Sequence, residues 1–199
     1  MRTIPERLRL GASLLALAVI AAGACEQPRL ISKDKLEQLV LSETDLPAGF
    51  ASFYKGPQVR LDDQGTARSD PGRFGRQGGW IIRLRQSDPS VTHGLQVIES
   101  RADLFPGSDG ARSDLDLYRK VLASTSGDGL ENIAPPALGD EAIGITFTMA
   151  APRPIRFFRI AWRAHNVTAS LTVQAFEGDV SLADALSLAR LQQRRIETA

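Results

Sequence analysis

The segment LGDEAIGITFTMAAPRPIRFFRIAWRAHNVTASLTVQAF, residues 138–176, contains the clearest β-strand signal of the chain. Apolar and polar residues alternate in three runs, at residues 143–149, 158–163 and 167–173. Alternation with period two places one face of a strand on a core and the other toward solvent. We therefore expect three neighbouring strands, with a tight turn before the last one in which Asn166 adopts the left-handed conformation.

The chain on either side of this segment adds two strands and three helical segments. Further alternation predicts strands at residues 79–86 and 94–104, with a change of face near Glu99 that suggests a bulge. Helical spacing and capping residues predict helices within residues 35–41, 108–124 and 181–196. Neighbouring strands with few helices indicate an α+β fold, an antiparallel β-sheet with helices packed mainly on one face.

Composition indicates one globular domain, which we place at residues 35–199. The chain has 199 residues, of which 43% are hydrophobic and 24% are charged. Its formal net charge of +1 gives no electrostatic reason to expect a nucleic-acid partner. Residues 55–79 lack periodicity and are rich in Gly, Pro, Asp and Arg, which predicts a mobile loop, with a functional loop as the alternative.

The N-terminus indicates export. Residues 1–24 have the positive start and the short apolar run of a signal peptide, and the run is too short for a transmembrane helix. The following Ala22-Gly23-Ala24-Cys25 resembles a bacterial lipobox, although Leu is favoured where Ala22 stands. We expect Cys25 to carry acyl chains such as palmitate, with residues 25–34 as a tether that holds the protein on the extracytoplasmic face of the cell membrane. Ordinary signal cleavage at the same bond, which would give a secreted protein, is the alternative.

Four short motifs resemble a known family of extracellular domains: SETDLPAGF at 42–50, LGDEA at 138–142, RAHNV at 163–167 and LARLQQRRI at 188–196. They look like the sensor-like domain of actinobacterial receptor serine/threonine kinases and of related envelope lipoproteins. The resemblance covers most of residues 36–197 and implies an antiparallel sheet flanked by helices, with a cleft. Those domains use disulfides, whereas the single cysteine here excludes an internal one.

Catalytic, metal and cofactor motifs give no signal. The two histidines, His93 and His165, lack neighbours at metal-ligand spacing, and we expect no metal and no cofactor. We find neither a nucleophile elbow nor a phosphate-binding loop. We therefore expect a non-catalytic protein.

The candidate binding residues are cationic. Arg83 and Arg85 follow one predicted strand, and Arg159 and Arg163 follow another. If these strands are neighbours, the guanidinium groups form a patch that binds a carboxylate, a phosphate or a lipid headgroup. The alternative is a solvated sheet face paired with Glu99 and other acids. Phe157 is expected on the face opposite the main apolar residues of its strand, where it either lines a ligand cleft or lies under a helix.

These observations favour a lipid-anchored envelope protein that binds a small anionic or lipid ligand, or an envelope protein partner. One alternative is a secreted or anchored hydrolase that uses His93 or His165 with an acid. The other is a structural envelope lipoprotein without a ligand. A pocket in the fold, and the residues that line it, would separate the three.

Overall fold

The computed structural model describes residues 29–58, 71–88 and 90–199. The signal peptide, Cys25 and residues 59–70 of the expected loop lie outside these ranges. The described ends of that loop have regular structure, since β1 continues to Pro57 and a 3₁₀ turn spans Pro71–Phe74.

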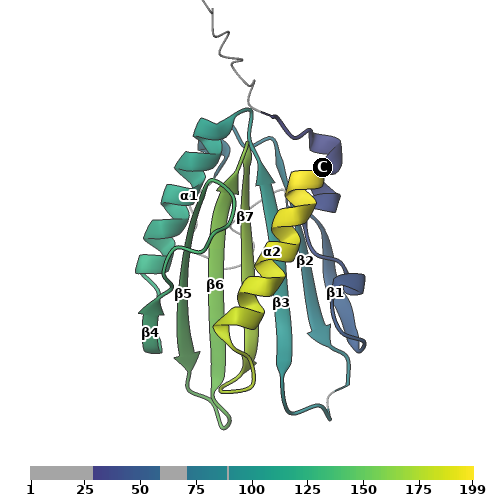
Figure 1. Cartoon of the computed structure of the whole chain (residues 1–199), viewed down its shortest axis with the longest axis vertical. Coiled ribbons are helices and arrows are strands. Elements are labelled where there is room, and N and C mark those ends of the chain that lie inside the picture. Colours follow the sequence, from purple (N-terminus) through teal and green to yellow (C-terminus); the bar gives the residue numbers. More distant parts are fainter. Residues whose placement is uncertain (1–28, 59–70, 89) are drawn as a thin grey trace, which may run out of the picture.

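Seven antiparallel strands form one sheet in the order β1-β2-β3-β7-β6-β5-β4 (Figure 1). The strands are β1 Phe50–Pro57, β2 Gly78–Gln86, β3 Leu95–Leu104, β4 Asp128–Asn132, β5 Glu141–Met149, β6 Ile155–Ala164 and β7 Val167–Phe176. The helices are α1 Ser108–Ala123 and α2 Leu182–Thr198, with the 3₁₀ segments η1 Lys33–Leu39, η2 Glu43–Asp45 and η4 Pro71–Phe74. The predicted α+β class and antiparallel sheet are confirmed.

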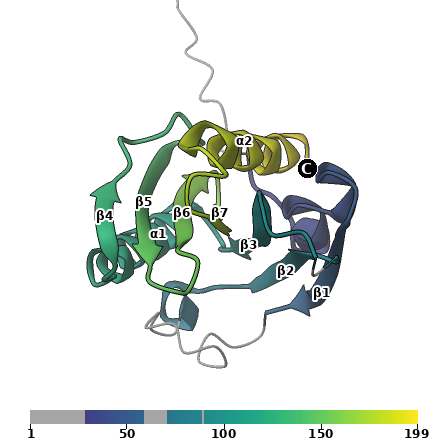
Figure 2. The same cartoon turned by 90° about the horizontal axis from the view of Figure 1, so that it is seen from below.

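The long helices divide between the two faces of the sheet, as Figure 2 shows with α2 and α1 on opposite sides. This differs from the expected packing mainly on one face. The reason is the register of β5 and β6, in which Phe147 pairs with Phe157 and Thr146 pairs with Phe158. The apolar residues of β5 therefore share a face with the less apolar side of β6, so both faces of the sheet need cover.

Helix α2 and η1 cover the first face. Trp162 is fully buried there, packed in one cluster with Leu171, Ala189 and Ile196. Its indole Nε1–H donates to Oε1 of Gln193 on α2 at 2.6 Å. Burial of an aromatic ring with its polar atom satisfied orients α2 as well as stabilising it.

Helix α1 covers β5, β6 and β7 on the second face. Its Leu122 packs with Ile145, Phe147 and Phe157 in a separate buried cluster. The rings of Phe147 and Phe157 are stacked with centroids 4.9 Å apart. Beyond α1, the second face of β2 and β3 carries several charged side chains, among them Arg83, Glu99 and Arg101.

The β6–β7 turn places His165, not Asn166, in the left-handed conformation, with φ of 56°. Asn166 is instead buried, and its side chain joins the turn to two other backbone segments, at Ile31 and at Phe105. Its amide nitrogen donates to the carbonyls of Ile31 and Phe105 at 3.0 and 2.8 Å, and its Oδ1 accepts from the Ile31 N–H at 2.8 Å. The turn therefore holds the start of the described chain against the sheet.

Candidate functional site

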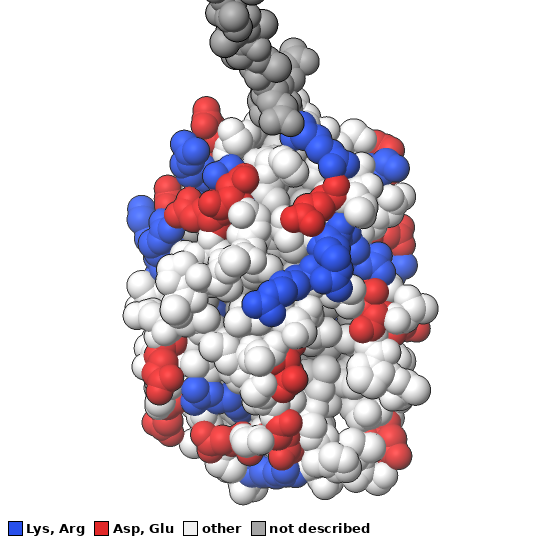
Figure 3. Space-filling view, viewed as in Figure 1, with Lys and Arg blue, Asp and Glu red and all other residues white. Residues whose placement is uncertain are grey.

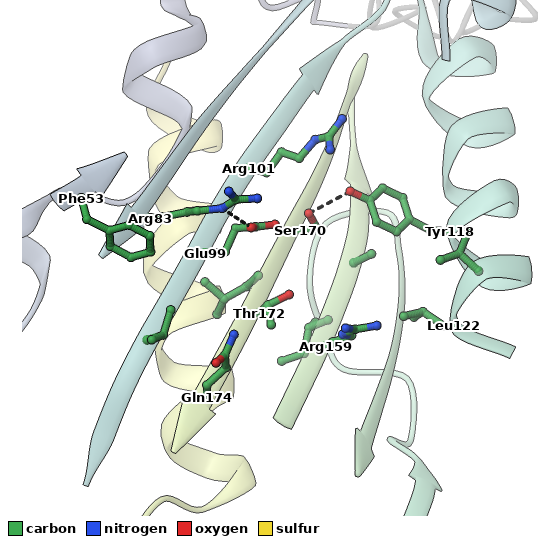
Figure 4. A pocket seen from close by; sticks show the side chains of 15 residues that line it. Phe53, Arg83, Glu99, Arg101, Tyr118, Leu122, Arg159, Ser170, Thr172 and Gln174 are labelled. Carbon is green, nitrogen blue, oxygen red and sulfur yellow. Dashed lines mark hydrogen bonds and ion pairs between the residues drawn. The ribbon is translucent and has the colours of Figure 1, made fainter. Parts of the chain in front are cut away.

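A cavity of about 380 Å³ opens on the second face, beside α1 (Figure 4). Its floor is formed by β3, β7 and β6, and its walls by α1 and by Phe53 of β1. The lining residues are Phe53, Arg83, Val97, Glu99, Arg101, Tyr118, Val121, Leu122, Arg159, Ile160, Ala161, Ser170, Leu171, Thr172 and Gln174. We call this cavity the second-face pocket. Its volume lies in the range of small-molecule sites.

Strand register builds a charged row across the pocket floor. Arg83 pairs with Glu99, Glu99 with Thr172, and Thr172 with Arg159. Paired residues of one row point to the same face, so these four side chains project together into the pocket. Neighbouring strands lie about 4.8 Å apart, so Thr172 separates Glu99 from Arg159 by two strand spacings.

Two of the three arginines of the pocket are ion-paired. Nε of Arg83 donates to Oε2 of Glu99 at 2.7 Å, and Nε of Arg101 donates to Oδ2 of Asp103 at 2.7 Å. Asp103 is fully buried and also accepts from Arg76 at 2.5 Å. These pairs fix the positions of Arg83 and Arg101 and neutralise part of their charge.

Arg159 differs from both. Its side chain is half-buried, and the described residues supply neither a hydrogen bond nor an ion pair to its guanidinium group. Burial lowers the pKa of Arg159 from its usual value, while the charge of Glu99 opposes that shift. The ring of Phe147 lies 5.2 Å from its guanidinium carbon. Arginine stays protonated even so, and the pocket therefore contains a partly desolvated positive charge.

The α1 wall of the pocket is mostly apolar. Val121 and Leu122 contribute aliphatic groups, and the Tyr118 hydroxyl lies 2.9 Å from the Ser170 hydroxyl. This hydrogen bond ties α1 to β7 at one end of the pocket (Figure 4). The pocket can therefore accept an apolar group beside α1 and an anionic group at Arg159.

The structure separates the predicted site residues. Arg83 and Arg159 both line the second-face pocket, although β2 and β6 are not neighbours. Arg85 is exposed, with its guanidinium 5.3 Å from the Phe53 ring at the rim. Arg163 donates to Oδ2 of Asp140 at 2.7 Å, outside the pocket. Phe157 is buried under α1, against Phe147 and Leu122. Of the two expected placements, a ligand cleft or burial under a helix, the structure has the second.

Sequence reasoning missed Arg101, Glu99 as a pocket residue, and Tyr118. The change of face in β3 was expected near Glu99, whereas the register shift lies between Leu95 and Val97. With the shift there, Glu99 and Arg101 fall on one face by simple alternation. Tyr118 lies on α1, and only the packing of α1 on β7 brings its hydroxyl to the pocket.

The arginines that line the other cavities are ion-paired. Two larger hollows, of about 410 and 590 Å³, lie along η1. The arginine of the first, Arg76, is bound to Asp103, and that of the second, Arg195, is bound to Asp45 at 2.7 Å. Figure 3 shows further basic side chains over α2 with acidic ones close by. The volume of a cavity therefore does not identify the candidate site. We identify it by Arg159, whose guanidinium group has no hydrogen-bonding or ion-pairing partner among the described residues.

The histidines lie apart from these cavities. His93 is exposed in the loop before β3, and His165 lies in the β6–β7 turn, where its N–H donates to Asp140. Neither lines the second-face pocket or the two hollows along η1. The arrangement that a histidine-dependent hydrolase needs, a cleft with a nearby serine and carboxylate, is thus not formed around either one in this part of the chain.

Comparison with known proteins gives a match in structure. A scan of protein families and a search of curated proteins found no match. The fold is similar to that of the extracellular domain of PknH from Mycobacterium tuberculosis, with a TM-score of 0.66 and 12% sequence identity over 86% of this chain and 100% of that one. No helix within the described ranges is long and apolar enough to span a membrane. The fold of this chain therefore resembles that of the PknH extracellular domain.

Proposed function

We propose that this chain is a lipid-anchored, extracytoplasmic, non-catalytic protein whose domain binds a small anionic ligand in the second-face pocket. The half-buried Arg159, without a hydrogen-bonding or ion-pairing partner among the described residues, is the observation that carries the proposal. Burying a charge costs free energy unless a counter-charge accompanies it. An anionic ligand supplies that counter-charge.

The similarity to the extracellular domain of PknH supports the extracytoplasmic part of the proposal. The signal-peptide pattern and the lipobox-like Ala22-Gly23-Ala24-Cys25 support the anchor. Ile31 is fixed to the sheet by Asn166, and the six-residue step from Cys25 to Ile31 can span at most about 20 Å. A lipid on Cys25 would therefore keep the domain close to the bilayer surface.

Intact-mass measurement of the protein from the membrane fraction tests the anchor. We expect the mature chain to begin at Cys25 with acyl chains attached, and the Cys25→Ser variant to move to the soluble fraction. An unmodified mature chain that is soluble without the substitution would contradict lipidation. That result would leave the ligand site untouched, because the two features lie in different parts of the chain.

An envelope protein partner is the second candidate ligand. The exposed aromatic side chains of β1, Phe53 and Tyr54, favour it, because Phe53 also forms a wall of the pocket. In that case an acidic side chain of the partner would occupy the place of the anionic ligand. Crosslinking from position 53 in intact cells tests this: a discrete crosslinked protein would support the partner, and its absence would favour the small ligand.

A further inference from the structure

We propose that the second-face pocket selects a monoanionic amphiphile, with one carboxylate-like group at Arg159 and an apolar body along α1. The inference rests on the proposed function and narrows it to a ligand class. It follows from the one uncompensated charge in the cross-strand row of the pocket floor, the position of Glu99 and the chemistry of the α1 wall.

The arginines of the pocket differ in how far their charges are balanced inside the protein. The charge of Arg83 is balanced by Glu99, whereas Arg101 shares the carboxylate of Asp103 with Arg76 and is balanced only in part. Arg159 has no such pair among the described residues. Its planar guanidinium group matches the two oxygens of a carboxylate, which accept two parallel hydrogen bonds. One negative charge at Arg159 balances the cross-strand row of Arg83, Glu99, Thr172 and Arg159.

Glu99 then limits the charge of the ligand. It lies in the same cross-strand row as Arg159, with only Thr172 between them. Its carboxylate acts on Arg159 through space, since its charge favours the protonated guanidinium group. A ligand with a second negative charge at this place would be repelled by Glu99 or would have to displace it from Arg83. Like charges held close together in a partly desolvated site are costly.

Two polar side chains beside Arg159 can orient the ligand. Thr172 faces Arg159 directly across β6 and β7, and Gln174 follows on the same face. Neither side chain makes a hydrogen bond to another described residue, and both are half-buried. Each can donate to a ligand oxygen, which an anion bound at Arg159 would supply.

The α1 wall supplies the apolar part. Val121 and Leu122 from α1 and Val97 and Ala161 from the floor present carbon atoms to the cavity. An aliphatic or aromatic group placed there loses contact with water and gains about 25 cal/mol per Å² of apolar area. An inorganic anion could not use this surface. The two ends of the pocket thus call for one molecule with an acid at one end and an apolar group at the other.

Calorimetric titration with three eight-carbon probes tests the inference. The exported full-length Cys25→Ser chain is titrated at pH 7 with octanoate, 1-octanol and octyl phosphate, so that no attached lipid competes for the site. We expect octanoate to bind at least about tenfold more tightly than 1-octanol, since a charge-assisted hydrogen bond is worth roughly one to two powers of ten. Octyl phosphate, which carries about −1.5 to −2 charges at this pH, should bind no more tightly than octanoate.

Substitutions tie the selectivity to Arg159. Arg159→Gln should weaken octanoate at least about tenfold and leave 1-octanol unchanged, whereas Arg159→Lys should keep most of the preference. Arg112→Gln is the matched control, because Arg112 is an exposed residue of α1 outside the pocket and the same charge is lost. It should change nothing. Unfolding curves of each variant confirm that it is folded.

The outcomes separate this inference from the proposed function. Equal affinity for octanoate and 1-octanol, tighter binding of octyl phosphate, or an Arg159→Gln variant that keeps the preference would overturn the monoanionic class while leaving a pocket that binds ligands. Absence of binding by every probe would overturn both. The predicted order of affinities, lost in Arg159→Gln and kept in Arg112→Gln, would support both.

Discussion

Gly139 occupies a position that no other residue fits. Its φ is 52°, and a Cβ built on it would lie 2.2 Å from the carbonyl oxygen of Arg163. The close approach lets the next residue, Asp140, accept from the Arg163 guanidinium and from the His165 N–H. The Gly-Asp pair therefore closes the end of the β5–β6 ladder.

Gly139→Ala should destabilise the protein by about 3 kcal/mol or more, because backbone strain adds to a clash with main-chain atoms. Gly178→Ala is the matched control, since Gly178 also has a positive φ, of 86°, but its Cβ would meet nothing within 4 Å. It should cost about 1 kcal/mol. Urea unfolding measures both. Equal losses would show that the contact with Arg163 does not matter.

Asp45 gives the domain a stability that depends on acid pH. Burial opposes its ionisation, but hydrogen bonds from Arg195 and Ser42 outweigh burial and lower the pKa of Asp45 below its usual value. A carboxyl group whose pKa is lower in the folded protein than in the unfolded chain stabilises the fold at pH values above the unfolded pKa of about 3.9. This stabilisation is lost as the pH falls through the pKa of the folded state.

Asp45→Asn should therefore cost about 1–2 kcal/mol at pH 7 and should flatten the loss of stability between about pH 4 and pH 2. The exposed Asp128→Asn serves as control and should change stability by less than about 0.5 kcal/mol. Thermal unfolding at a series of pH values gives both quantities. If the Asp45→Asn variant lost stability between about pH 4 and pH 2 as steeply as the native protein, the Arg195 contact would not be the cause of that loss.

At the scale of the elements, the sequence predicted strands and helices well where periodicity was strong. The runs within residues 138–176 correspond to β5, β6 and β7, and the capping box at Ser181 opens α2. The helical spacing at 35–41 is found as the 3₁₀ segment η1. These features depend on local patterns, which a sequence contains in full.

Pairing and register were not predictable in the same way. The pairing of Phe147 with Phe157 decides whether the apolar residues of β5 and β6 point to one face of the sheet or to two. Alternation within each strand does not specify this pairing. The pocket has the same cause. It needs β2 and β6 to be separated by β3 and β7, and a register shift in β3 that local sequence placed wrongly.

The side chain of Asn166 holds the N-terminal segment and the end of β3 to the β6–β7 turn. Asn166→Ala removes three hydrogen bonds and leaves the buried polar groups of Ile31 and Phe105 without them. We expect a loss of about 2–4 kcal/mol and faster hydrogen exchange at the Ile31 amide. The exposed Asn132→Ala should leave both unchanged. Unchanged exchange at Ile31 in Asn166→Ala would show that the N-terminal segment is held by other contacts.

At the scale of the whole molecule, one sheet with apolar patches on both faces explains how a small domain forms a core and a pocket together. Helix α2 and η1 close the first face, and α1 covers β5 to β7 on the second. The parts of β3, β7 and β6 beside α1 form the floor of the pocket. The fold thus resembles that of the PknH extracellular domain, and its cavity lies beside α1.

Backbone NMR of the exported full-length Cys25→Ser chain during titration with octanoate tests the central claim, that the second-face pocket is the ligand site. The account predicts that the largest amide shifts fall on Glu99, Arg159, Thr172 and Gln174 and on the Tyr118 to Leu122 part of α1. They should disappear in Arg159→Gln. Shifts centred on η1 and the start of β2, or an equal response in Arg159→Gln, would contradict it.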